Sequence, residues 1–134
     1  MGSTSSVSEQ TPGRARAVSV LVIDDDADSR DAIQMLLEEE GYSVATAADG
    51  TAALEKLATL SPRLILLDLC MPVMDGAAFR ERQMKDDSLA AIPTVVMTAR
   101  AAPGRAAAPL LARACLAKPI DFDELLTIVG HYCR

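Results

Sequence analysis

At 134 residues and a net charge of −6, the chain has the size of one acidic domain. The acidic balance excludes a nucleic-acid backbone as the main partner of this chain, because phosphates are bound by clustered Lys and Arg. Three dispersed cysteines without zinc-binding spacing, and the lack of an apolar segment suited to a signal peptide or a membrane span, indicate a soluble cytoplasmic protein.

The chain begins with a segment, residues 1–17, that is rich in Ser, Thr, Gly and Pro without periodic apolar residues, and we expect a flexible tail there. The β-branched run VSVLVI at 18–23 predicts a buried strand, which stops at three consecutive acids at 24–26. An amphipathic helix is predicted within 26–42, because apolar residues recur there at helical spacing, and Gly41 is the signal that ends it.

Strands and helices alternate from there to the C-terminus. β-branched and apolar runs predict further strands at 42–47, 63–69, 93–99 and 114–118. Helical patterns predict helices at 49–61, 76–87, 101–113 and 121–133. Pro62 is expected to end the first of these helices, and Pro103, Gly104 and Pro109 to make the third short, broken or mobile. Such alternation predicts a doubly wound α/β fold, in which helices cover both faces of a parallel sheet.

The residues that end the predicted strands form a second pattern. In doubly wound folds the reactive groups lie at the carboxyl ends of the strands. Those ends carry Asp24 and Asp25, Asp68, Thr98 and Lys118. Converging carboxylates repel one another unless a hard divalent cation neutralises them, and Mg²⁺ prefers such oxygen ligands. Since a lysine and a hydroxyl can hold a phosphoryl group, the set predicts phosphoryl transfer to a carboxylate nucleophile.

Four motifs resemble the receiver domain of two-component response regulators, across nearly all of residues 18–133. DLCMPVMDG, which begins at Asp68, is similar to the family's phosphoacceptor segment, and DDD after the first strand is similar to its acidic metal pair. VVMTA, around Thr98, is similar to its switch-hydroxyl segment, and LAKPI, around Lys118, to its conserved lysine turn. The resemblance implies a flavodoxin-like, five-stranded parallel sheet in the order 2-1-3-4-5, within one receiver domain at 18–134.

The resemblance also implies the chemistry of the site. Asp68 would accept a phosphoryl group from a phosphohistidine of a histidine kinase or phosphotransfer protein, or from a small acyl phosphate. Mg²⁺ would be bound by Asp25, by Asp68 and by the backbone carbonyl of Cys70. Asp24 would act on the ion mostly through water. The chain would then be no enzyme beyond catalysing its own phosphorylation and dephosphorylation.

The response to phosphorylation is implied in the same way. Lys118 would pair with Asp68 and then with the phosphoryl oxygens, and Thr98 would move towards the phosphoryl group as the switch. A cis peptide bond is expected between Lys118 and Pro119, where the cost of the cis form is low. The signal would pass to a downstream protein effector or to a fused output domain, without contact of this chain with nucleic acid or membrane.

Two departures from the family pattern concern the output. Cys115 stands three residues before Lys118, where the family usually has Tyr or Phe as the rotating partner of the switch hydroxyl. A cysteine cannot reproduce the movement of an aromatic ring between buried and exposed rotamers. The Pro- and Gly-containing segment at 101–113 is also on the face by which receivers usually meet their effectors. We therefore expect intact phosphorylation with an altered output.

Two other functions remain open from the residues. A receiver-like module that binds a partner without being phosphorylated would explain the altered output residues. A phosphohydrolase of the haloacid dehalogenase type also has Asp-x-Asp after its first strand, but Asp28 stands here in place of the usual hydroxyl. An EF-hand is excluded, because Ser29 and Met35 occupy the loop positions that need Gly and Glu.

Overall fold

The structure, a computed structural model, describes residues 16–69, 76–98 and 114–133 of the chain. The helix expected at 101–113, and all but the end of the tail expected at 1–17, lie outside these described residues. The first strand begins at Arg16, two residues before the run from which it was predicted.

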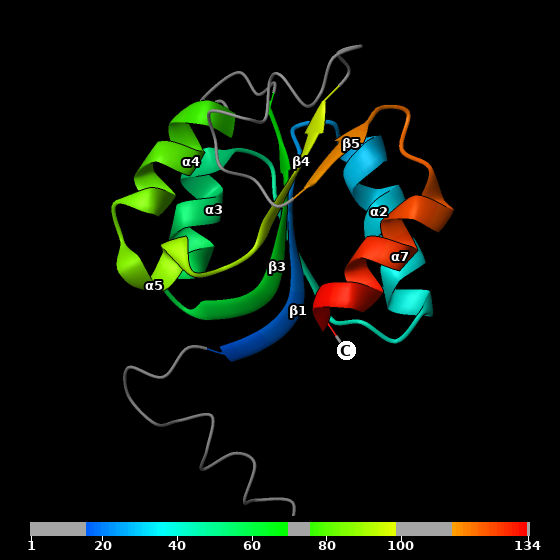
Figure 1. The fold of residues 1–134 in the computed structure, drawn as a ribbon, viewed down its shortest axis with the longest axis horizontal. Coiled ribbons are helices and arrows are strands. Elements are labelled where there is room, and N and C mark those ends of the chain that lie inside the picture. Colours follow the sequence, from blue (N-terminus) through cyan, green and yellow to red (C-terminus); the bar gives the residue numbers. More distant parts are fainter. Residues whose placement is uncertain (1–15, 70–75, 99–113, 134) are drawn as a thin grey trace, which may run out of the picture.

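Five parallel strands form one sheet in the order β2-β1-β3-β4-β5, which confirms the predicted flavodoxin-like fold (Figure 1). The strands are β1 (Arg16–Ile23), β2 (Val44–Ala47), β3 (Leu60–Asp68), β4 (Thr94–Thr98) and β5 (Ala114–Ala117). The helices of the described part are α2 (Ala27–Glu39), α3 (Gly50–Leu57), α4 (Gly76–Met84), α5 (Asp87–Ala90) and α7 (Phe122–Cys133). None of these helices has the length and apolar character needed to cross a membrane.

The prediction that Pro62 separates a helix from a strand was wrong. Helix α3 ends at Leu57, and β3 begins at Leu60 and includes Pro62. Pro62 is paired with β1 alone, because pairing of β3 with β4 begins only at Ile65. A strand that has one neighbour at that point tolerates a residue without a backbone N–H.

The helix predicted over 76–87 is two helices. Helix α4 ends at Met84, and Asp86 caps a new helical turn by accepting hydrogen bonds from the amides of Ser88 and Leu89. Asp is among the preferred residues at such N-caps, because its carboxylate satisfies amides that have no intrahelical acceptor. Asp86 and Asp87, the predicted end of one helix, are thus the N-cap and the first residue of the short helix α5.

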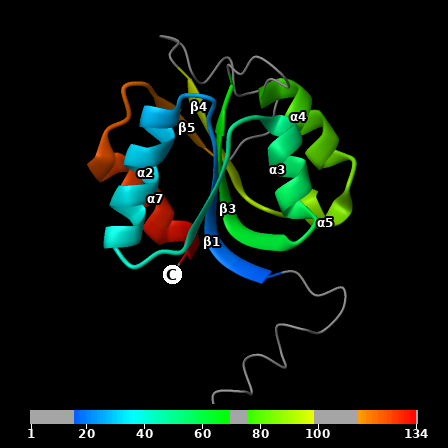
Figure 2. The same ribbon diagram turned by 180° about the vertical axis from the view of Figure 1, so that it is seen from behind.

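Two hydrophobic clusters lie on opposite faces of the sheet. Helices α2 and α7 cover one face, and α3, α4 and α5 cover the other, as the views from the two sides show (Figures 1 and 2). Strand β1 supplies both clusters, because successive side chains of a strand point to opposite faces. Val20 and Val22 pack towards α2 and α7, and Leu21 and Ile23 pack towards α3 and α4. All four of these side chains are fully buried.

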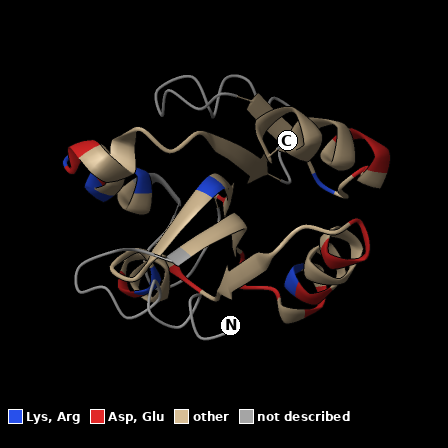
Figure 3. Cartoon of the chain, turned by 90° about the horizontal axis from the view of Figure 1, so that it is seen from below, with Lys and Arg blue, Asp and Glu red and all other residues tan. Residues whose placement is uncertain are grey.

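The helices that follow β1 and β2 begin with aspartate caps. Asp26 accepts from the amides of Asp28 and Ser29, and Asp49 accepts from the amide of Ala52. Asp26 is therefore the helix-start acid of α2. Helix α2 carries four acids and one basic residue, and the chain seen from below shows this charge on a helix that flanks the sheet (Figure 3). Both caps fix where the chain leaves the carboxyl ends of the strands.

Candidate functional site

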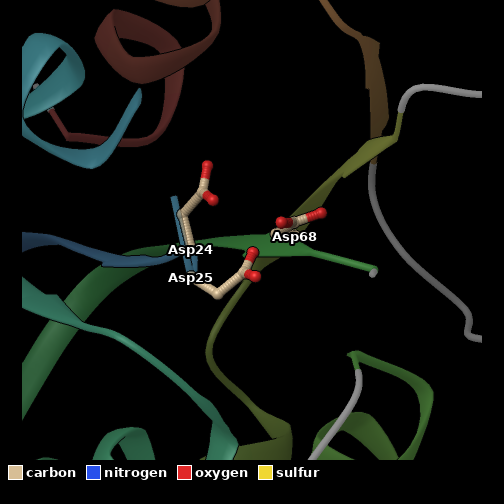
Figure 4. A group of neighbouring side chains, drawn as sticks. All are labelled: Asp24, Asp25 and Asp68. Carbon is tan, nitrogen blue, oxygen red and sulfur yellow. The ribbon is translucent and has the colours of Figure 1, made fainter. Parts of the chain in front are cut away.

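Three carboxylates meet at the carboxyl end of the sheet. Asp24 and Asp25 directly follow β1, and Asp68 is the last residue of β3. One oxygen from each carboxylate lies within 4.8 Å of the others, and the three side chains converge from two adjacent strands (Figure 4). Asp24 is fully buried and Asp68 is 4% exposed, whereas Asp25 is exposed to solvent.

The register of the sheet explains this convergence. Strands β1 and β3 are parallel neighbours, with Ile23 opposite Leu67. The residues that follow this pair are Asp24 and Asp68, so the apolar run of each strand ends in an acid at the same level of the sheet. Because the two apolar runs are buried on both faces, neither strand can shift without moving its acid away from the other.

Lys118 brings a cation to the two buried acids. Its Nζ lies 3.1 Å from Oδ2 of Asp24 and 3.4 Å from Oδ2 of Asp68. Burial by itself would lower the pKa of the Lys118 amine, but the interactions with Asp24 and Asp68 outweigh it, so this pKa lies above its ordinary value. Lys118 is therefore protonated at neutral pH. The family resemblance implied the pair with Asp68, and the shorter contact with Asp24 is an additional finding.

The backbone holds Lys118 in this position. The amide of Lys118 donates to the carbonyl of Thr98 at 2.8 Å, which extends the pairing of β5 with β4 by one hydrogen bond. The peptide bond between Lys118 and Pro119 is cis, as expected. The chain thus turns directly after the lysine.

Asp24 is held by hydrogen bonds at its amide, its backbone carbonyl and its carboxylate. Its amide donates to the carbonyl of Ala47 at 3.1 Å, and its Oδ1 accepts from the amide of Asp26 at 2.9 Å. Its backbone carbonyl accepts from Nη1 of Arg30 at 2.7 Å. Arg30 was not singled out in the sequence, because an arginine in the first turns of an acidic helix is usually a solvated charge. Its one sequence signal is its position six residues after Asp24, on the helix that the acids precede.

The other predicted site residues are only partly described. Thr98 is the last residue of β4, and it is buried. It directly follows Met97, which is paired with Asp68 in the sheet. Cys70 lies outside the described residues, so the structure shows nothing of its carbonyl. Cys115 is half-buried in β5 beside the cluster under α3 and α4, where burial raises the pKa of its thiol.

The donor set fits a hard divalent cation. It consists of carboxylate oxygens, and two of the three carboxylates are almost inaccessible to water. Lys118 neutralises one unit of negative charge among these three acids, so a net negative site remains for a metal ion. Oxygen ligands around a small site with one exposed, adjustable carboxylate suit Mg²⁺, which keeps several waters and takes one or two carboxylates.

Comparisons with known proteins identify the family of the chain. The family model described as the response regulator receiver domain matches residues 20–130. The chain is 35% identical to an uncharacterized 14.6 kDa protein of Leptolyngbya boryana, with 87% of this chain and 90% of that protein covered. It is also 35% identical to the response regulator Rre1 of Synechocystis sp., over 87% of this chain but about half, 52%, of the length of Rre1.

A solved structure supports the same relationship. The chemotaxis protein CheY4 of Vibrio cholerae superimposes with a TM-score of 0.78 at 28% sequence identity, covering 89% of this chain and 99% of CheY4. These matches do not favour the haloacid dehalogenase alternative. The structural match agrees with the fold described above.

Proposed function

Because the chain belongs to the response regulator receiver domain family, we propose that it accepts a phosphoryl group on Asp68 from the phosphohistidine of a histidine kinase or phosphotransfer protein. The observation that carries the proposal is the position of Asp68, a buried acid beside a second buried acid and a lysine that contacts both. A small acyl phosphate is expected to serve as an alternative donor.

In the proposed reaction, a carboxylate oxygen of Asp68 attacks the phosphorus atom. The bond between phosphorus and the imidazole nitrogen of the donor breaks, and its electron pair stays on that nitrogen, which takes up a proton. Lys118, which already contacts Asp68, is proposed to hold an oxygen of the transferred group through its positive charge. The hydroxyl of Thr98 is proposed to donate a hydrogen bond to another oxygen and so to report the modification.

The proposed metal ligands are Asp25, Asp68 and the backbone carbonyl of Cys70, with Asp24 acting through water. Mg²⁺ bound there would offset the negative charge that the donor brings to the acids. Asp24 keeps its own contacts with Lys118 and with the amide of Asp26, and it therefore anchors the cluster.

We propose that the domain catalyses only its own phosphorylation and dephosphorylation. We also propose that it acts in the cytoplasm. The signal is proposed to pass to a protein effector or to an output domain in the same protein. Cys115 lacks the aromatic ring that in the family usually rotates as the partner of the switch hydroxyl. We therefore propose that the output uses contacts other than an aromatic side chain at this position.

Intact-mass measurement tests the proposal directly. The protein is incubated with Mg²⁺ and acetyl phosphate, and the matched variant Asp68→Asn is treated in the same way. We expect one added phosphoryl group in the wild type, its loss on addition of a chelator before the donor, and no adduct in Asp68→Asn. A wild-type mass that does not change would overturn the proposal, and repeated release of phosphate from a monoester would favour a phosphohydrolase instead.

A further inference from the structure

The guanidinium of Arg30 makes an unusual contact for the only basic residue of the acidic helix α2. Arg30 is half-buried, and its Nη1 donates a hydrogen bond of 2.7 Å to the backbone carbonyl of Asp24. We propose that Arg30 is a positioning residue for the metal-binding acids, which it serves by holding the loop between β1 and α2. This inference rests on the proposed Mg²⁺-dependent function.

The loop that carries the acids is closed by hydrogen bonds at both ends. The amide of Asp26 donates to Oδ1 of Asp24, and the carboxylate of Asp26 accepts from the amides of Asp28 and Ser29. The amide of Arg30 donates to the carbonyl of Asp26 at 2.9 Å. Arg30 therefore holds the loop twice, by its backbone at the helix end and by its side chain at the strand end.

Asp25 lies between Asp24 and Asp26, which these hydrogen bonds fix, and its position depends on them. Its carboxylate is exposed, and its oxygen still comes within 4.8 Å of those of Asp24 and Asp68. An exposed side chain has many rotamers, so the direction of its backbone decides how often it faces the other acids. A loop fixed on both sides of Asp25 preorganises the carboxylate for a metal ion, as outer partners do for ligands in known metal sites.

The charge of Arg30 acts in the opposite direction. A cation near the acids repels a divalent ion, so removal of the charge alone would tighten Mg²⁺ binding. Removal of a positioning contact would weaken binding. The sign of the change in affinity therefore separates the two roles.

The test is a Mg²⁺ titration of the metal-free protein followed by amide shifts in ¹H–¹⁵N NMR spectra, since the chain has no Trp. Arg30→Met keeps the apolar stem but removes the donor and the charge, and Arg30→Lys keeps a charged donor. Gln34→Met is the matched control, because Gln34 lies one turn further along α2 and its side chain donates only to the exposed Glu38 among the described residues. Arg30→Gln replaces Arg30→Met if the latter does not fold.

We expect Arg30→Met to raise the dissociation constant of Mg²⁺ about tenfold, and Arg30→Lys to recover most of this loss. Gln34→Met should bind as the wild type does. In metal-free Arg30→Met, the backbone order parameters of Asp25 and Asp26 should fall from about 0.85 towards 0.6.

An unchanged or tighter dissociation constant in Arg30→Met would overturn the inference while leaving the proposed function intact. An equal loss in Gln34→Met would also overturn it, because the effect would then belong to the helix as a whole. A wild-type protein that binds no Mg²⁺ would overturn the proposed function, and the inference with it.

Discussion

The amine of Lys118, directly after β5, lies 3.4 Å from the carboxylate of Asp68, at the end of β3. The same amine lies 3.1 Å from Asp24, so one cation is shared by two buried acids. The side chain of Lys118 is 21% exposed, whereas the side chains of Asp24 and Asp68 are 0% and 5% exposed. The lysine is thus the part of this group that an incoming ligand can reach and rearrange.

Replacing Lys118 should destabilise the metal-free protein. Lys118→Met leaves Asp24 and Asp68 without their shared cation, and we expect the free energy of unfolding to fall by about 2 kcal/mol, below the range for fully buried pairs because water still reaches the lysine. Mg²⁺ should restore more stability in this variant than in the wild type, because loss of the lysine charge tightens Mg²⁺ binding and the stabilisation grows with the logarithm of the affinity. Urea unfolding with and without Mg²⁺ measures both effects. The control Lys85→Met changes an exposed lysine and should alter stability by less than about 0.5 kcal/mol.

Asp25 should control metal binding with little effect on folding. Its carboxylate is exposed, so Asp25→Asn should change the free energy of unfolding by less than about 0.5 kcal/mol. The loss of one ligand should weaken Mg²⁺ binding at least about tenfold, measured by calorimetric titration. Asp28→Asn removes an exposed acid from the first turn of α2, three residues after Asp25, and should bind Mg²⁺ as the wild type does. Equal losses in the two variants would show that general charge, rather than ligation, attracts the ion.

Thr94 should matter for stability but not for the site. Its buried hydroxyl accepts from Nε2 of Gln83 at 3.1 Å and from Nη1 of Arg80 at 3.2 Å, at the opposite end of β4 from Thr98. Thr94→Val removes a buried acceptor from both Gln83 and Arg80, and we expect the free energy of unfolding in urea to fall by about 2 kcal/mol.

The adduct at Asp68 should still form in Thr94→Val. Thr46→Val, on strand β2, is the matched control, because no side-chain hydrogen bond of Thr46 is present among the described residues. A Thr94→Val protein as stable as this control would show that the polar contacts between α4 and β4 contribute nothing to folding.

Asp86 should make part of the stability depend on pH. The hydroxyl of Ser88, and also the amides of Leu89 and Ser88, donate to its carboxylate and hold the pKa of Asp86 below its ordinary value. The unfolded chain then binds a proton more readily than the folded chain, so the stabilisation is present above the unfolded pKa and is lost as the pH falls through the folded pKa.

The variant Asp86→Asn tests this dependence, because Asn can cap the helix but does not titrate. Thermal unfolding of the wild type should lose more stability below about pH 4 than that of Asp86→Asn. Asp87→Asn removes a neighbouring charge without touching the three hydrogen bonds, and it should follow the wild type. Parallel curves for the wild type and Asp86→Asn would contradict the assignment.

The strand ends were predictable because burial leaves a strong pattern. Apolar runs such as the one before Asp68 are long enough to identify buried strands, and the ends of parallel strands lie at one edge of the sheet. Convergence of acids on that edge therefore follows from residue order alone. The pairing of Lys118 with Asp24 does not, because it depends on which side chains are buried and on a separation of 94 residues.

Predictions from single residues were less reliable than those from apolar runs. Pro62 looked like a helix end, but its effect depends on whether a neighbouring strand needs its missing N–H, which only the register reveals. Arg30 was missed because its residue type suits a solvated helix face, and only the structure shows its contact with the carbonyl of Asp24. Both cases depend on tertiary neighbours that a pattern of residue types does not contain.

The sharing of Lys118 between the two acids sets an order of events during protein synthesis. Asp24 leaves the ribosome first, Asp68 follows, and the lysine comes 50 residues after Asp68. Until β5 has emerged and docked on β4, the two acids have no lysine between them. A nascent chain therefore lacks the complete cluster, and the proposed phosphorylation of Asp68 has to wait until β5 is in place.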